Sequence, residues 1–460
     1  MPSEPMRGEG QGCRLNRRTF LGCGAALSGV LAAQRLASAA APDGGGRPPN
    51  VVLIISDDQG WGDYGFMGHP TIRTPQIDRL AAESLLLPRS YVTAPLCCPS
   101  LGSIITGLHP HQNGITSNDP PQVGGKRGWP PERLKLREEV ISNIDRVATL
   151  PRLLKQRGYV SLQTGKWWLG NHSRGGFTHG MTHGDPKRDG RHGDAGLAIG
   201  RETMQPITDF IDAAGEKPFF VWYAPFLPHS PHNPPKRLLA KYQDKTTSMH
   251  IARYWAMCER FDETVGQLLD YLDTRSLAAN TLVLYVCDNG WIQQPNSSGH
   301  TPRSKQSRFD GGVRTPIMVR WPGRVKPRRD DEAVASSIDL APTILAACGL
   351  EPTAGMQGVN LLDEKALSGR EAVFGAVYTH DAVDIHKPAR NLMWRWCVSG
   401  RWKLCLPNRA VAPDATAELY DLKADPNESH NLATRHPDEV ARLRRLIDAW
   451  YAPVSQAPPG

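Results

Sequence analysis

Short apolar runs alternate with longer amphipathic segments along most of the chain. The runs are continuous, as expected for strands buried on both faces of a sheet. They predict strands at residues 50–55, 159–164, 218–224, 281–287 and 316–320. The segments between them have apolar residues at helical spacing and predict helices within residues 74–84, 148–158, 200–215 and 250–273. This alternation predicts an α/β domain with a largely parallel sheet covered by helices.

The last ninety or so residues have a different pattern. From about residue 372 there are short β-like pieces, followed by an amphipathic helix from Pro437 to Trp450. Cys397 and Cys405 flank the turn VSGRWKL. In an oxidising compartment they could form a disulfide across a hairpin, and a pair of core cysteines is the equally favoured alternative.

Polar residues follow directly after four of the predicted strands. They are Asp57 and Asp58, Lys166, His229, and Asp288 and Asn289. In open α/β sheets ligands bind at the carboxyl ends of the strands. We therefore expect these residues, which come from four separate segments, to meet in one crevice.

The residue types in that crevice favour a hard cation and an anionic ligand. Asp57, Asp58, Asp288 and Asn289 offer only oxygen ligands, which suit Ca²⁺, with Mg²⁺ as the alternative, and do not suit zinc. A single aspartate after a strand would more simply cap a turn or a helix. Two strands ending in Asp-Asp and Asp-Asn favour metal binding. Lysine and histidine side chains beside the cation are what a sulfate or phosphate group requires, and the candidates are Lys166, Lys305 and His229.

Composition and charge exclude several other classes. The chain has 460 residues and a formal net charge of +8, but its basic residues are scattered and form no stripe or arm. We therefore expect no nucleic-acid partner. The nine cysteines are not spaced as a zinc site. After the first forty residues no segment is long and apolar enough to cross a membrane.

The N-terminus has the pattern of an export signal. Arg17 and Arg18 precede an apolar stretch at residues 20–33, and small residues follow at 37–39. This predicts that residues 1–41 are a twin-arginine signal peptide. We expect a bacterial protein that is exported in the folded state to the periplasm or secreted, with no membrane contact beyond export.

The motifs occur in an order that resembles the type I sulfatases of the alkaline-phosphatase-like superfamily. The stretches that carry the resemblance include NVVLIISDDQGWGDYG, CCPSLGSIITGLHPHQNGI, GKWWLG, CDNG and SRFDGGVRTPIMVRWPG. The likeness runs from Asn50 to about Ala433. It implies a catalytic domain at residues 47–370, with helices on both faces of its sheet. It also implies a subdomain at residues 371–460, with a small antiparallel sheet and a packed helix.

The resemblance also implies a role for each matching residue. Asp57, Asp58, Asp288 and Asn289 match the calcium ligands of the family. Cys97 matches the cysteine that a maturation enzyme oxidises to formylglycine, whose hydrated aldehyde attacks sulfur and expels the alcohol. Residues matching Lys166, His229 and Lys305 hold the sulfate group and assist departure of the alcohol. The implied substrate is a sulfate ester of a carbohydrate or an aryl alcohol.

Two positions depart from the family pattern. Leu101 stands where the family has an arginine, and Trp168 where it has a histidine, and both of those side chains contact the aldehyde hydrate. The segment 175–194 and His111 offer replacement donors. Within the segment the candidates are His179, His183, Lys187, Arg188 and His192, and a solvated glycine-rich loop is the equally favoured interpretation.

Three functions remain open at this point. The first is an active sulfatase in which Cys97 is still converted to formylglycine. The second is a phosphate mono- or diester hydrolase that uses an unmodified Cys97 thiolate beside the metal. The third is a catalytically inactive protein that binds sulfated glycans. The intact set of metal ligands favours the first two, and we place the sulfatase first.

Overall fold

The computed structural model of the protein describes residues 47–125, 128–185 and 188–453. The expected signal peptide lies outside these residues. Within the described part of the chain, no helix combines the length and the apolar character needed to span a bilayer.

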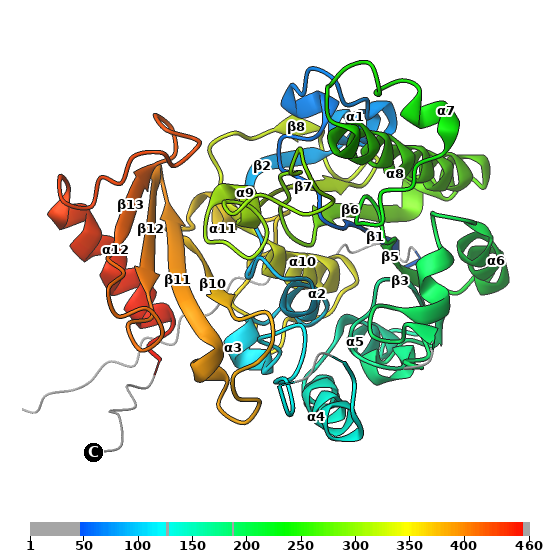
Figure 1. Ribbon diagram of the computed structural model, residues 1–460. Helices are drawn as coiled ribbons and strands as arrows, with labels where there is room; N and C mark the ends of the chain where they lie inside the picture. Colours follow the sequence, from blue (N-terminus) through cyan, green and yellow to red (C-terminus); the bar gives the residue numbers. More distant parts are fainter. Residues whose placement is uncertain (1–46, 126–127, 186–187, 454–460) are drawn as a thin grey trace, which may run out of the picture. The chain divides into compact units, whose positions relative to one another are not determined.

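The larger of two sheets is mixed but mostly parallel (Figure 1). Its strands follow the spatial order β4-β3-β5-β1-β6-β7-β2-β8, with β9 paired to β2. The central strands β3, β5, β1 and β6 are mutually parallel, whereas β7 is antiparallel to both of its neighbours. The bounds are β1 (Asn50–Ser56), β2 (Leu85–Tyr91), β3 (Val160–Gly165), β4 (His179–Gly180), β5 (Phe219–Ala224), β6 (Thr281–Cys287), β7 (Arg314–Arg320), β8 (Arg328–Arg329) and β9 (Ala335–Ser336).

Helices cover both faces of this sheet. Alternate residues of β1 enter different cores: Leu53 packs with α2, α5 and α10, and Ile54 packs with α1, α6 and α8. Figure 1 shows α2 and α10 on the opposite side of the sheet from α1 and α8. Because both faces are covered, β1 is buried throughout and apolar from Val51 to Ile55. The helices are α1 (Pro75–Ala82), α2 (Cys97–Thr106), α3 (Pro110–Asn113), α4 (Pro131–Ile141), α5 (Leu150–Lys155), α6 (Gln205–Ala214), α7 (Lys236–Leu239), α8 (Met249–Thr274), α9 (Asp310–Val313), α10 (Leu340–Ala347), α11 (Glu364–Ser368) and α12 (Pro437–Trp450).

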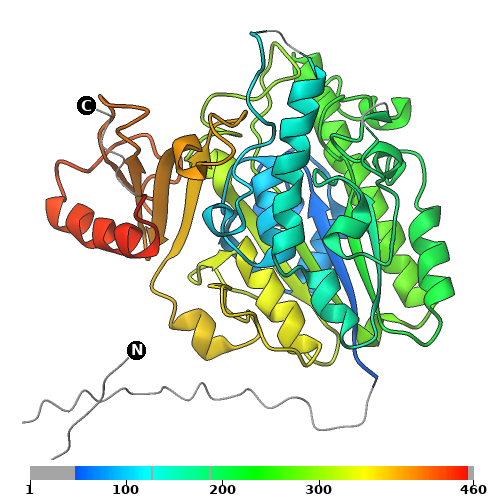
Figure 2. The same ribbon diagram turned by 90° about the horizontal axis from the view of Figure 1, so that it is seen from below.

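The second sheet is antiparallel and has the order β10-β11-β12-β13. Its strands are β10 (Val373–Tyr378), β11 (Leu392–Ser399), β12 (Trp402–Pro407) and β13 (Glu418–Asp421). Helix α12 packs on one face through Leu443 and Ile447, and Figure 2 shows it alongside these strands. The opposite face, which includes Trp396, packs against residues that follow β2 and precede β7 in the larger sheet.

The strand register decides whether Cys397 and Cys405 in this sheet can form a disulfide. Cys397 lies opposite Leu404, and Cys405 lies opposite Trp396. Because neighbouring residues of a strand point to opposite faces, the two thiols belong to different cores. Both are free and buried, so the core interpretation is correct and the hairpin disulfide does not form.

A buried ion cluster joins the two sheets. The Lys403 ammonium of β12 lies 2.7 Å from an Asp310 carboxylate oxygen and 2.9 Å from a Glu428 carboxylate oxygen. The Asp310 backbone N–H also donates to Glu428 (2.6 Å). All three side chains are almost fully buried. Since α9 begins at Asp310, this cluster holds the end of the loop that carries Lys305.

We expect Lys403→Met to lower the free energy of unfolding by about 3–5 kcal/mol, because it removes the one ammonium group that two buried carboxylates share. Chemical denaturation of the purified protein measures the loss. Lys423→Met is the matched control, since Lys423 is 73% exposed and its nearest carboxylate is 3.9 Å away. Equal midpoints for the two variants would contradict a stabilising role for the cluster.

Candidate active site

The two aspartate-bearing strands place their acidic residues side by side. Strands β1 and β6 run parallel and in register up to Ser56 and Cys287. Asp57 and Asp58 continue β1, and the Asp288 N–H donates to the Ser56 carbonyl oxygen (2.9 Å). The Asp58 N–H in turn donates to an Asp288 carboxylate oxygen (3.2 Å). The acidic residues at the carboxyl ends of these two strands therefore lie together, as expected.

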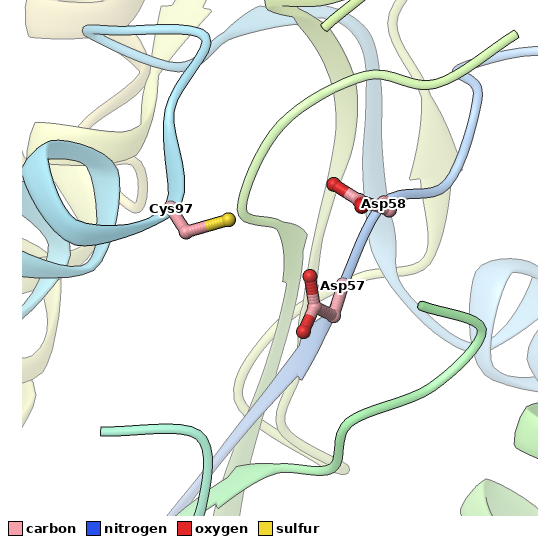
Figure 3. A group of neighbouring side chains, drawn as sticks. All are labelled: Asp57, Asp58 and Cys97. Atoms are coloured by element: carbon pink, nitrogen blue, oxygen red, sulfur yellow. The ribbon is translucent and has the colours of Figure 1, made fainter. Parts of the chain in front are cut away.

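Cys97 enters this crevice from the opposite side. It is the first residue of α2, and its sulfur points toward Asp57 and Asp58 in Figure 3. A ligand atom from each of these three residues lies within 4.8 Å of the others. The N-terminal end of α2 adds a partial positive charge, which favours an anion at this point. Cys98 turns away from the crevice, and its N–H donates to the Asn118 side chain (2.9 Å).

Lys166 reaches the crevice because the chain turns sharply after β3. Gly165 has φ +73°, and a Cβ atom there would lie 1.9 Å from the Ala224 carbonyl oxygen. Only glycine therefore fits. The Lys166 ammonium then lies 2.6 Å from Asp57 and 3.0 Å from the Cys97 sulfur.

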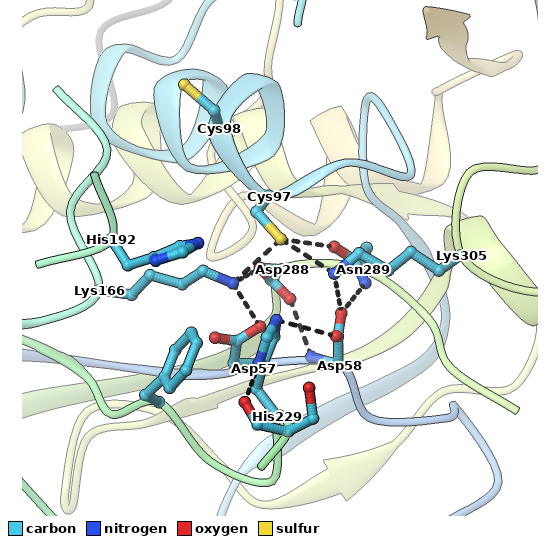
Figure 4. Close-up of polar contacts among 12 residues, drawn as sticks. Asp57, Asp58, Cys97, Cys98, Lys166, His192, His229, Asp288, Asn289 and Lys305 are labelled. Atoms are coloured by element: carbon cyan, nitrogen blue, oxygen red, sulfur yellow. Dashed lines mark hydrogen bonds and ion pairs between the residues drawn. The ribbon is translucent and has the colours of Figure 1, made fainter. Parts of the chain in front are cut away.

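Lys305 and Asn289 complete the contacts of the thiol (Figure 4). The Lys305 ammonium lies 2.5 Å from Asp58 and 3.1 Å from the Cys97 sulfur. The Asn289 amide donates to Asp58 (2.6 Å), and its side-chain oxygen lies 3.5 Å from the same sulfur. Two ammonium groups and one amide therefore surround the sulfur at contact distance.

His229 stands at the edge of this cluster. Its Nδ1 lies 2.6 Å from the Ser230 carbonyl oxygen, which fixes Nδ1–H as the donor and turns Nε2 toward Asp58 at 3.4 Å. The side chain is 18% exposed, whereas Asp58 is 1% exposed. The structure thus brings together all eight residues that the sequence singled out: Cys97, Lys166, His229, Lys305, Asp57, Asp58, Asp288 and Asn289.

Three carboxylate oxygens in the cluster have no hydrogen-bond partner. They are Oδ2 of Asp57, Asp58 and Asp288, all deeply buried. Buried carboxylate oxygens without donors are costly, and a hard divalent cation satisfies them. The residues present therefore fit a hard divalent cation, to which the side-chain oxygen of Asn289 would add a fourth ligand.

Burial and the neighbouring charges set the protonation of the site. Burial raises the pKa of the Cys97 thiol to about 12, although Lys166 and Lys305 act in the opposite direction. Burial would also raise the pKa of Asp58, but Lys305, His229 and Lys166 lower it below its usual range. Burial alone would lower the pKa of Lys166, yet the surrounding acids and the thiol raise it, so the lysine is an ammonium ion.

Leu101 and Trp168 bring no polar contact to the sulfur. Leu101 is buried in the core beneath α2 and lines a small space beside Asp57, Lys166 and Asp288. The Trp168 indole N–H is buried and has no hydrogen-bond partner. At these two positions the chain places neither a charged group nor a hydrogen-bond donor in contact with the Cys97 sulfur.

Among the replacement donors that fall within the described residues, only His192 lies beside the site. Its ring is next to the Lys166 side chain in Figure 4 and 4.8 Å from the Trp168 ring. His179, His183 and Arg188 are exposed, and His111 stacks on Tyr451 (4.1 Å). Lys187 lies outside the described residues.

The sequence did not single out Arg191, the residue before His192. Its guanidinium lies over the Trp168 ring at 4.4 Å and pairs with Asp119, which is 72 residues away in the chain. Nothing in the local sequence marks this contact.

A second acidic group is held by arginines. Asp119, His380 and Asp381 lie close enough together to share an ion. Asp119, however, pairs with Arg191 and Arg137, and Asp381 pairs with Arg133 (3.1 Å). These ion pairs already satisfy the carboxylates.

Comparison with known proteins identifies the family. Residues 49–350 match the Sulfatase family model, and residues 300–448 match the model of the C-terminal part of N-sulphoglucosamine sulphohydrolase. The N-acetylgalactosamine-6-sulfatase of Canis lupus familiaris is 32% identical over 380 residues, which are 72% of this chain and 68% of that protein. The N-acetylgalactosamine-6-O-sulfatase of Bacteroides thetaiotaomicron is 25% identical and covers 87% and 92% of the two chains.

Solved structures show the same fold. The PsFucS1 sulfatase from Pseudoalteromonas sp. superimposes with a TM-score of 0.67 at 19% identity, covering 88% of this chain and 90% of that one. The Sulfatase family model alone matches about two thirds of the chain. The matched stretch, residues 49–350, includes every residue of the cluster around Cys97. The chain therefore belongs to the sulfatase family of sulfuric ester hydrolases.

Proposed function

We propose that the protein is an exported sulfatase that hydrolyses a sulfate ester of a carbohydrate, with formylglycine derived from Cys97 as the nucleophile. Asp57, Asp58, Asp288 and Asn289 would hold Ca²⁺, or Mg²⁺ as the alternative. The observation that carries this proposal is the position of the Cys97 sulfur. It lies 3.0 and 3.1 Å from two buried ammonium groups, in a cluster with three unpartnered carboxylate oxygens.

The buried and the more exposed side chains of this site would contact different parts of the substrate. Lys166 and Lys305 are ammonium ions beside the sulfur, so they would bind the oxygens of the sulfate group. His229 lies nearer to solvent and presents Nε2, so it would contact the departing alcohol. When bound, the cation would polarise the sulfate group and the nucleophile. The catalytic residues of the proposal are thus Cys97, Lys166, His229 and Lys305.

Relatives support a carbohydrate as the alcohol. Two of the relatives described above are named N-acetylgalactosamine 6-sulfatases. One structure with the same fold holds its substrate D-glucosamine-2-N,6-O-disulfate. Export fits a polymeric glycan, because such a substrate must be met outside the cytoplasm. The proposal includes the twin-arginine signal at residues 1–41, the catalytic domain at 47–370, the subdomain at 371–460 and a maturation enzyme that oxidises Cys97.

The alternative functions give different results in one experiment. Mass spectrometry of the peptide that contains Cys97 distinguishes a thiol from an aldehyde, and parallel assays with aryl sulfate and aryl phosphate esters show which ester is cleaved. We expect the aldehyde and turnover of the sulfate ester. A thiol together with phosphatase activity would establish the phosphate-ester hydrolase instead. A thiol with no turnover of either ester in the presence of Ca²⁺ would favour a glycan-binding protein.

A further inference from the structure

A cavity of about 530 Å³ lies at the same edge of the large sheet as the active site. Its walls include Trp61, Ile292 and Arg303. In the sequence, each of these residues is within three positions of a proposed metal ligand or of Lys305. The loops that carry the active-site residues therefore continue into the walls of this cavity.

A further wall comes from residues 426–429, which follow β13. Glu428 has φ +55°, an uncommon conformation for a residue other than glycine. Its carboxylate is held by the Lys403 ammonium (2.9 Å) and by the Asp310 N–H (2.6 Å), and its carbonyl oxygen accepts from Arg303 (2.7 Å). This wall is therefore fixed before a ligand binds, which lowers the entropy cost of binding.

Arg303 gives the cavity a positive charge that no acid balances. Its guanidinium lies over the Phe309 ring at 3.5 Å, and Nη2 donates to two backbone carbonyl oxygens (2.7 and 3.1 Å). Among the described residues, Nε and Nη1 have no hydrogen-bond partner, and no carboxylate forms an ion pair with the guanidinium. Glu428 is already paired with Lys403, and Asp425 accepts from the His430 N–H (2.8 Å) and does not line the cavity. The free N–H groups of Arg303 are thus available to an anionic group.

The other lining side chains suit a sugar. Thr301, Asn427 and Ser429 line the cavity, and none of their side chains has a hydrogen-bond partner within the described part of the chain. Trp61 is half-buried and Ile292 is 45% exposed, so they add apolar surface. A pyranose is complementary to this mixture, because its hydroxyl groups form hydrogen bonds while its C–H groups pack against apolar side chains.

We propose that this cavity binds a second, negatively charged sugar residue of the glycan whose sulfate ester is cleaved, and that Arg303 pairs with the anionic group of that residue. This inference rests on the proposed function. A sulfate and a carboxylate group share the required chemistry, and the test below distinguishes them.

The test compares a long and a short substrate: a chondroitin 6-sulfate hexasaccharide and methyl N-acetylgalactosaminide 6-sulfate. Arg303→Gln is expected to raise KM for the hexasaccharide about tenfold, with kcat changed less than about twofold, because one charge-assisted contact is lost. KM for the monosaccharide should stay the same. Equal changes on both substrates, or none, would overturn the inference. If the effect persists on the carboxyl-reduced hexasaccharide, Arg303 binds a sulfate group, and if it disappears there, Arg303 binds a carboxylate.

Two further variants make the result specific. Arg324→Gln is the matched control: Arg324 is also exposed and lies over an aromatic ring, that of Trp321 (5.9 Å). It follows the end of β7, which pairs with the start of β6 and so lies at the opposite edge of the sheet. Arg324→Gln should leave both KM values unchanged.

Asn427→Asp tests the same cavity without removing Arg303. The substitution keeps the size of an exposed side chain and adds a carboxylate next to Arg303, which donates to the Asn427 carbonyl oxygen (3.1 Å). The new charge would neutralise Arg303, so KM should rise for the hexasaccharide only. If Arg303→Gln does not fold, the Asn427→Asp result decides.

The proposed function and this inference can fail separately. If the wild type cleaves neither substrate nor an aryl sulfate, the proposed function is refuted. Calorimetry with the hexasaccharide then tests the cavity alone. Binding to Arg303→Gln that is about tenfold weaker than to the wild type would support the inference, and equal Kd values would refute it.

Discussion

Replacing Cys97 by alanine is expected to lower kcat for sulfate-ester hydrolysis by about 10⁴-fold or more, because alanine lacks the thiol whose oxidation would give the proposed formylglycine. The sulfur lies within 3.5 Å of Lys166, Lys305 and Asn289, and those contacts remain available to the sulfate group of the substrate. Substrate should therefore still bind, so KM should change far less than kcat. Steady-state kinetics with an aryl sulfate measures both constants.

Cys98→Ala is the matched control for this variant. Cys98 is the next residue of α2 and is also buried, but its side chain points away from the cluster in Figure 4. Each substitution removes one buried sulfur from the same helix, so both should lower stability by a similar amount, about 1 kcal/mol. Activity of Cys98→Ala should stay within about threefold of the wild type.

A Cys97→Ser variant with full activity would exclude Cys97 from the mechanism.

Strands β1, β5 and β6 could be predicted from the sequence because burial on both faces makes them almost continuously apolar. Strands β1 and β6 match the predicted runs closely. Strand β2 was not predicted, since Pro88 interrupts it and its pairing with β7 shifts register between Leu87 and Ser90. The sequence also does not predict that β7 is antiparallel to its neighbours, because a buried strand has the same continuous apolar pattern in either direction.

The site could be predicted only as far as strand ends determine it. Asp57 and Asp288 follow parallel neighbouring strands, so their proximity follows from topology. Arg191 is different, because it owes its position to Asp119 and Trp168, which come from separate loops. Likewise, Cys397 and Cys405 lie on opposite faces because of the register between β11 and β12. A shift of one residue between these strands would place both cysteines on the same face.

Removing the proposed divalent cation by chelation is expected to abolish turnover and lower the melting temperature. The unpartnered oxygens of Asp57, Asp58 and Asp288 meet at the end of β1 and β6, and without a cation these buried like charges repel one another. Free Ca²⁺ at 100 times its Kd should stabilise the folded protein by about 2.7 kcal/mol. Calorimetry after chelation, followed by addition of Ca²⁺ or Mg²⁺, measures this. A larger increase with Ca²⁺ than with Mg²⁺ at equal concentration would identify the preferred ion.

The change in melting temperature caused by Asp288→Asn shows whether Asp288 is a metal ligand or an acid with a structural role only. The substitution removes one of three clustered negative charges, so the chelated variant should melt at a higher temperature than the chelated wild type. The increase produced by Ca²⁺ should become much smaller, because one charged ligand is lost. Asp63→Asn is the matched control: Asp63 accepts from Tyr254 (2.6 Å) and Gly60 (3.1 Å), outside the cluster. Its response to Ca²⁺ should equal that of the wild type. If Ca²⁺ and Mg²⁺ leave the melting temperature of the wild type unchanged, the carboxylates do not form a metal site.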